Sequence, residues 1–166
     1  MTCLFELSIA LLITLLNGFF VMAEYSLVRI RKSRLDELIR QGKSRANTVL
    51  KMSEKLDTYL SATQLGITAS SLLLGWFGGP LLAEMFRGMF GVSAGTWYDH
   101  SLVFACAFLI IVFLHVVFGE LVPRTIALGK VEQVAMAVAY PLVFFHYLLY
   151  PLVVLFNRIS HAVSVS

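Results

Sequence analysis

The sequence predicts an all-α integral membrane protein with three transmembrane helices, a cytoplasmic helical pair and a juxtamembrane helix broken by prolines. Of its 166 residues, 58% are hydrophobic and 14% are charged, whereas soluble domains are about half apolar and about a quarter charged. The apolar residues form long runs rather than amphipathic stripes, which argues against burial in a soluble core. Nine of the thirteen Lys and Arg residues lie between 29 and 57.

The first predicted span covers residues 3–27. A signal peptide is disfavoured because the segment lacks a basic start, carries Glu6 and has no small-residue cleavage site. The positive-inside rule places the basic segment 29–57 in the cytoplasm and the N-terminus outside. Topology and attraction to anionic lipid headgroups account for this basic charge, so we expect no nucleic-acid partner.

The basic segment itself is predicted to form two short cytoplasmic helices. Apolar residues recur in it at helical spacing, and Gly42 interrupts the pattern. The recurring positions are Leu35, Leu38, Ile39, Val49, Leu50 and Met52.

A second span is predicted over 59–82 and a third over 101–122. A glycine-rich outer loop at 86–100 would join them, with Trp97 at interfacial depth. Arg124 and Lys130 would then return the chain to the cytoplasmic side.

The last apolar stretch, 134–156, is long enough for a fourth span. Pro141 and Pro151 divide it into pieces shorter than a bilayer, and basic residues flank both of its ends. We therefore favour a proline-broken helix at the cytoplasmic interface, over about 132–160, and a cytoplasmic C-terminus. A true span remains the alternative.

Glu120 is the first candidate functional residue, because an acid within a membrane span is costly and marks a functional site by default. Pro123 has no N–H, and in a regular helix its donor would have served the carbonyl of Gly119. A freed carbonyl beside a carboxylate suits a hard cation such as Mg²⁺, Ca²⁺ or Na⁺. The alternative is an interfacial carboxylate in a salt bridge with Arg124, one turn on.

The second span offers possible neutral ligands. Its small and polar residues recur at steps of three and four, which places them on one helix face and the face beside it. Packing between membrane helices is the plainer explanation. Opposite Glu120, the same residues would supply hydroxyl oxygens. The positions are Ser61, Gln64, Thr68, Ser71 and Gly75 on one face, and Thr63, Gly66 and Ser70 on the other.

In the first span Asn17 and Glu24 lie seven residues apart and share a helix face. A ligand role and a structural role are equally open for both. His115 is expected to be a packed, hydrogen-bonded histidine rather than a metal ligand.

Enzymatic activity is not expected. The chain shows no nucleophile motif, P-loop or paired carboxylates. Cys3 and Cys106 form no CxxC pair, so neither a disulfide framework nor a zinc site is indicated.

Three ordered stretches resemble the transmembrane domain of the CorC/CNNM magnesium transporters, often labelled hemolysin-like in bacteria. They are "NGFFVMAEYSLVRIRKSRLDEL" at 17–38, "LSATQLGITASSLLLGWFGGP" at 60–80 and "HVVFGELVPRTIALGK" at 115–130. The resemblance extends over nearly the whole chain.

This resemblance implies a homodimer in the bacterial cytoplasmic membrane that exports Mg²⁺ in exchange for Na⁺. It also implies that a cytoplasmic CBS-pair domain follows the membrane part. We therefore expect residues 1–166 to be the transmembrane domain alone, without that cytoplasmic partner.

Residue by residue, the family's third-span acid matches Glu120, with Gly119 and Pro123 matching beside it. The family's second-span polar positions fall on "GITASS". Where animal members tend to have Asn, this sequence has Ile67 and Ser71, so only Ser71 would coordinate through its side chain. Val21 stands at the small polar position of the first span.

The expected Mg²⁺ ligands are accordingly Glu120 and the Gly119 carbonyl, with neutral or substitute ligands from the other two spans and water filling the remaining positions. These further positions are Ser71, Thr68, Ser70, Asn17 and Glu24. A membrane anchor and dimerisation module is the rival function. A pore-forming toxin is disfavoured because the helices are apolar enough to be permanently embedded.

Overall fold

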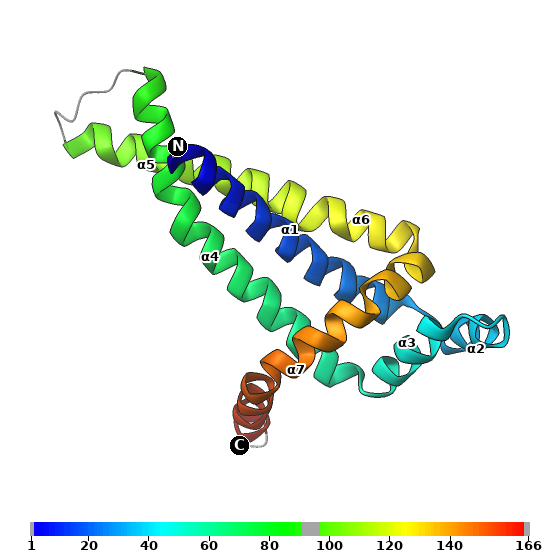
Figure 1. Ribbon diagram of the computed structural model, residues 1–166. Coiled ribbons are helices and arrows are strands. Elements are labelled where there is room, and N and C mark those ends of the chain that lie inside the picture. Colours follow the sequence, from blue (N-terminus) through cyan, green and yellow to red (C-terminus); the bar gives the residue numbers. More distant parts are fainter. Residues whose placement is uncertain (1, 91–96, 165–166) are drawn as a thin grey trace. The chain divides into compact units, whose positions relative to one another are not determined.

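The protein, described here by a computed structural model, is helical wherever its structure is described (Figure 1). The backbone is described for residues 2–90 and 97–164, and the side chains for 5–78, 105–106, 108–156 and 158–159. None of these residues forms a strand, which confirms the all-α prediction. The elements are α1 (Thr2–Arg29), α2 (Lys32–Arg40), α3 (Ser44–Glu54), α4 (Leu56–Phe90), α5 (Trp97–Leu114), the π-helix η1 (His115–Leu121), α6 (Val122–Gly129) and α7 (Val131–Ser164).

The chain divides into two compact units, each assembled from separate stretches of sequence. The first unit comprises Met1–Gly18 and Thr68–Val122, and the second comprises Phe19–Ile67 and Pro123–Ser166. The first unit therefore holds the start of α1, most of α4, and all of α5 and η1. The second holds the end of α1, the start of α4, and α2, α3, α6 and α7.

A small apolar core holds the first unit together. Ile13 of α1, Leu74 of α4 and Ile111 of α5 are buried against one another. Other large apolar side chains in this unit point outward, which suits a lipid surrounding better than water. Examples are Leu12, Leu15, Leu72, Trp76 and Phe113, of which Trp76 is 78% exposed.

The second unit contains the predicted helical pair, α2 and α3, drawn in cyan in Figure 1. Of the residues at helical spacing, Leu35, Leu38, Val49 and Met52 are buried, whereas Ile39 and Leu50 are half-buried. Between the helices Gly42 has φ +81°, its N–H donates to the Ile39 carbonyl, and the Lys43 N–H donates to the Leu38 carbonyl. This is the Schellman arrangement that ends helices at glycine, so the predicted interruption at Gly42 is confirmed.

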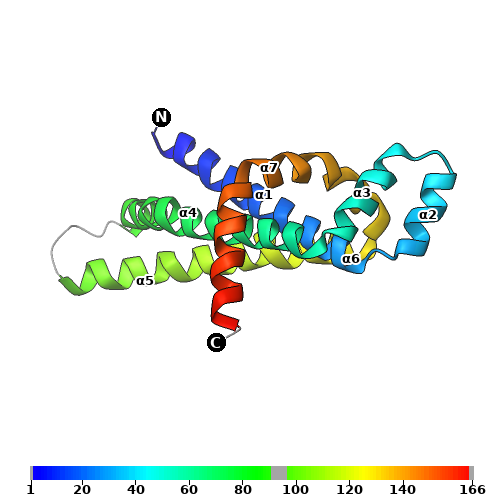
Figure 2. The ribbon, with the colours of Figure 1, turned by 90° about the horizontal axis from the view of Figure 1, so that it is seen from below.

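The last helix differs from its prediction. Pro141 and Pro151 both lie inside α7, which runs as one assigned helix instead of separate pieces. Figure 2 shows this helix bending sharply between its orange and red parts. A proline removes one hydrogen bond and crowds the preceding turn, so it can bend a helix without ending it.

Among the described residues, three helical stretches are long and apolar enough to cross a membrane: Phe5–Arg29, Phe108–Gly129 and Val131–Phe156. The first two overlap the predicted spans 3–27 and 101–122. The third stretch is also long and apolar enough to span a membrane. The placement of this helix at the cytoplasmic interface therefore stays a prediction. The predicted span 59–82 lies within the 35 residues of α4.

The outer loop is shorter than expected. Helix α4 continues to Phe90 and α5 begins at Trp97, so much of 86–100 is helical. A single glycine lowers helix stability by only about 1 kcal/mol, which the surrounding helix formers offset. The remaining residues, 91–96, lie outside the described structure.

Candidate functional site

The π-helix η1 is the most unusual backbone feature near the predicted site. At its end the Val122 N–H donates to the Val117 carbonyl, five residues back instead of four. Pro123 comes next, and its ring would collide with the Gly119 carbonyl in a regular α-helix. A widened turn avoids that collision, and such π segments are frequent at functional sites.

The carbonyl of Gly119 is indeed available to a side chain, as predicted from Pro123, but the group that reaches it is an amide. Asn17 Nδ2 donates to Gly119 O over 2.9 Å, joining residues 102 positions apart. Asn17 is 1% exposed. A Cβ on Gly119 would lie 3.0 Å from His115 Nδ1 and 3.2 Å from Asn17 Nδ2, so glycine permits this close approach.

Asn17 presents a second polar atom that has no such partner. Its Oδ1 is buried and accepts no hydrogen bond in the described structure. Leaving a buried acceptor unpaired costs about 1–3 kcal/mol, so this oxygen is a candidate to bind a water molecule or an ion. The amide orientation follows from the bond to Gly119, since a flipped amide would set two oxygens against each other.

His115 joins the second span to the π-helix. Ser71 Oγ lies 3.1 Å from His115 Nε2, while the buried Nδ1 of His115 has no hydrogen-bond partner. The prediction of a packed, hydrogen-bonded histidine is therefore confirmed. Of the other second-span candidates, Ser70 is buried and Thr68 is exposed.

Glu120 follows Gly119 directly in the π-helix η1. Its side chain is exposed in the single chain and forms no hydrogen bond or ion pair among the described residues. The guanidinium of Arg124 instead lies over the ring of Tyr25, 4.7 Å from its centroid. The alternative, a salt bridge between Glu120 and Arg124, is therefore not formed among the described residues.

Glu24, Thr63 and Gly66 belong to the second unit, where their contacts are those of packed helices. Glu24 is half-buried there. Thr63 donates to the Leu60 carbonyl of its own helix over 2.8 Å. A Cβ on Gly66 would come within 2.6 Å of the Phe20 ring, so this glycine allows α1 and α4 to pack closely.

The atoms that could bind a cation here are therefore mainly uncharged oxygen atoms. Among the described residues there is no cluster of three or more His, Cys, Asp or Glu side chains, which argues against a site of the zinc type in that part of the chain. Mg²⁺ binds oxygen ligands of this kind, and the candidates are Asn17 Oδ1 and the hydroxyls of Ser70 and Ser71.

The sequence alone did not reveal the contact between Ser71 and His115, or the π-helix. Pro123 carried a signal for the π-helix, because a helix that continues through a proline must rearrange the preceding turn. No spacing rule connects Ser71 with His115, since they lie 44 residues apart.

Comparison with known proteins gives one family over almost the entire chain. Residues 7–165 match the family model described as the cyclin M transmembrane N-terminal domain, CNNM. The chain is 41% identical to the UPF0053 protein YugS of Bacillus subtilis over 143 residues, which cover 86% of this chain and 33% of YugS. It is 42% identical to YhdP of the same organism over 90% of this chain and 34% of YhdP. An uncharacterized Mycobacterium tuberculosis protein, Rv1841c, is 37% identical over 93% of this chain and 44% of its own length. The chain thus spans about a third to somewhat under half of these relatives.

Proposed function

The chain belongs to the CNNM family of transmembrane domains, and from this premise we propose that it carries a divalent cation, Mg²⁺, across a membrane. One observation supports the proposal most directly. The buried Oδ1 of Asn17 has no partner, although the same amide is held firmly at Gly119. An oxygen fixed in place and lacking a donor is suited to a cation.

The proposed ligand set combines one charge with several dipoles. Glu120 supplies the carboxylate, and Asn17, Ser71 and Ser70 supply neutral oxygens, with Thr68 and the Gly119 carbonyl as further candidates from the sequence. An unpaired acid on an apolar helix is unfavourable by about 2.5–3.5 kcal/mol near the bilayer centre, and a dication removes that penalty. Neutral ligands and retained waters keep binding weak enough for release.

The family resemblance supports the finer parts of the proposal. These are Mg²⁺ efflux driven by Na⁺ entry, a two-fold homodimer, and residence in a bacterial cytoplasmic membrane with the N-terminus outside. Because the relatives are longer than this chain, we also propose that a CBS-pair domain on the cytoplasmic side regulates transport in the full-length protein. Catalysis has no place in this proposal.

Purified protein in liposomes loaded with a fluorescent Mg²⁺ indicator tests the proposal. Wild type should admit Mg²⁺ faster than empty liposomes, and Glu120→Gln should remove that flux while keeping the shape of the side chain. Glu54→Gln is the matched control, since Glu54 is an exposed carboxylate at the end of α3. Ser71→Ala should slow the flux less, because water replaces one hydroxyl.

Arg124→Ala tests the contact with the Tyr25 ring and not Glu120, because Arg124 and Glu120 form no ion pair among the described residues. If Glu120→Gln leaves Mg²⁺ binding and flux unchanged, the metal site is wrong.

The rival function is a membrane anchor and dimerisation module for cytoplasmic domains. The close packing of Phe20 against Gly66 favours it, because such packing needs no ion. Under this alternative wild-type protein would dimerise but neither bind Mg²⁺ nor pass it across liposomes.

A further inference from the structure

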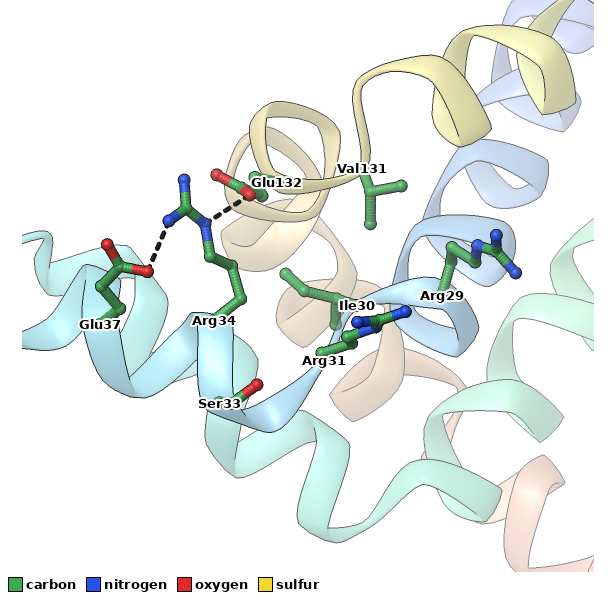
Figure 3. A pocket seen from close by; sticks show the side chains of 8 residues that line it. All are labelled: Arg29, Ile30, Arg31, Ser33, Arg34, Glu37, Val131 and Glu132. Atoms are coloured by element: carbon green, nitrogen blue, oxygen red, sulfur yellow. Dashed lines mark hydrogen bonds and ion pairs between the residues drawn. The ribbon is translucent and has the colours of Figure 1, made fainter.

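A polar cavity of about 450 Å³ lies in the second unit, where the end of α1, the start of α2 and the start of α7 meet (Figure 3). Its lining is rich in charge, unlike the apolar faces of the predicted spans. The charged and hydroxyl residues that line it are Arg29, Arg31, Ser33, Arg34, Glu37 and Glu132. Its volume falls in the usual range for small-ligand sites, about 300–1,000 Å³.

Arg34 neutralises one end of the cavity. Its Nε donates to Glu132 Oε1 over 2.6 Å, and its Nη1 donates to Glu37 Oε2 over 2.5 Å. The hydrogen bond to Glu132, and then that to Glu37, holds the pKa of Arg34 above its usual range. This bridge ties the helical pair to α7 and fixes the wall of the cavity.

Arg29 and Arg31 carry the charge that remains. Both are exposed, and neither forms an ion pair among the described residues. Arg34 with its two carboxylates has one net negative charge, whereas Arg29 and Arg31 together have two positive charges. In the view of Figure 3 their guanidinium groups lie away from the Arg34 bridge. An anion in the cavity would therefore sit at the Arg29 and Arg31 end.

The start of α2 adds neutral donors to the same place. Arg31 is its N-cap and makes no side-chain capping bond. The Arg34 N–H already donates to the Arg31 carbonyl, whereas the N–H groups of Lys32 and Ser33 come first in the helix and have no carbonyl of an earlier turn to bond. Ser33, the second residue of α2, also lines the cavity. Helix N-termini and paired guanidinium groups are both favourable partners for phosphate oxygens.

The position along the chain indicates where such a ligand would come from. Arg29 is the last residue of the stretch Phe5–Arg29, which is long and apolar enough to span a membrane. The cavity thus begins where that helix would leave the hydrocarbon layer, at the depth of lipid headgroups. We propose that the cavity is a phosphate-binding site, formed by Arg29, Arg31 and the start of α2, that takes a phospholipid headgroup or a soluble phosphate compound. The proposal does not depend on cation transport.

Native mass spectrometry of the purified full chain tests the lipid source, with dioleoyl phosphatidylglycerol compared against dioleoyl phosphatidylcholine. Wild type should retain phosphatidylglycerol preferentially. Arg29→Gln/Arg31→Gln should weaken that retention by about fivefold per arginine, the attraction expected of one basic residue near an anionic surface. Arg40→Gln/Lys43→Gln removes the same charge from residues of the helical pair that do not line the cavity, and it should retain the lipid as wild type does.

A second arm tests the soluble source by thermal unfolding in sodium pyrophosphate against sodium chloride at equal ionic strength. Stabilisation by pyrophosphate that Arg29→Gln/Arg31→Gln abolishes identifies a soluble ligand, and retention of phosphatidylglycerol alone identifies a lipid. If the double variant does not purify as a folded species, Arg31→Gln alone should show the same direction of change. The proposal is overturned if the arginine variants bind both probes as wild type does, or if the control pair loses as much binding as the arginine pair.

Discussion

Replacing Asn17 with alanine tests the candidate cation site most sharply, because one side chain supplies both of its distinctive features. The amide nitrogen donates to Gly119 O over 2.9 Å, and the amide oxygen is buried without a partner. Asn17→Ala removes both groups at once. The variant should lose little stability without Mg²⁺ and about half of the stability that Mg²⁺ adds.

The first expectation follows from two opposing terms. Loss of the hydrogen bond lowers stability by about 0.6–1 kcal/mol and leaves the Gly119 carbonyl unpaired. Removing the unpaired Oδ1 abolishes a penalty of about 1–3 kcal/mol of the same kind. These desolvation terms offset each other, so the Mg²⁺-free variant should be destabilised by only about 1–2 kcal/mol, including the small void left behind.

The second expectation follows from ligand linkage. A site filled at one hundred times its dissociation constant stabilises the folded protein by about 2.7 kcal/mol. If loss of the Asn17 oxygen weakens binding tenfold, the gain at the same Mg²⁺ concentration falls to about 1.4 kcal/mol. Thermal unfolding of purified protein, titrated with MgCl₂, measures both quantities.

Ser26→Ala is the matched control for this experiment. Ser26 is also buried in α1, and its hydroxyl donates to the Ala23 carbonyl of the same helix over 3.1 Å. The control should shift the Mg²⁺-free midpoint slightly and leave the Mg²⁺ titration unchanged. An Asn17→Ala variant that keeps the wild-type Mg²⁺ dissociation constant would refute the assignment of Asn17 Oδ1 as a ligand.

Three further predictions concern topology, assembly and packing. A cysteine at position 45 should resist membrane-impermeant reagents in intact cells and one at position 97 should react; labelling of position 45 from outside would overturn the orientation. Cross-linking or native mass measurement in detergent should give a dimer, and a monodisperse monomer that still binds Mg²⁺ would contradict the assembly. Gly66→Ala should destabilise the protein by about 1–3 kcal/mol, since its Cβ would meet the Phe20 ring at 2.6 Å. Gly75→Ala should be neutral or stabilising, because nothing lies within 4 Å of its Cβ; equal loss in both variants, measured by thermal unfolding, would rule out the Phe20 contact as the cause.

Local features of the chain were predictable where their cause acts within a few residues. Gly42 ends α2 through a positive φ, and the apolar spacing around it marks the buried faces of the helical pair. The break at Pro123 also follows from sequence, because a missing N–H frees a carbonyl at a known distance along the chain. The prolines of α7 do not divide it into separate pieces, because each weakens only one turn and the helix continues through both.

What the sequence by itself determined, then, is a helical membrane protein, the turn at Gly42 and a Gly119 carbonyl without its regular helical donor. Only the tertiary structure decided that Asn17 donates to that carbonyl, that Ser71 meets His115, and that Arg34 bridges α2 to Glu132 of α7. The physical reason is the range of the interactions. Backbone geometry and helical periodicity are set by neighbours in the chain, whereas these contacts join residues 44 to 102 positions apart and depend on which helix faces pack together.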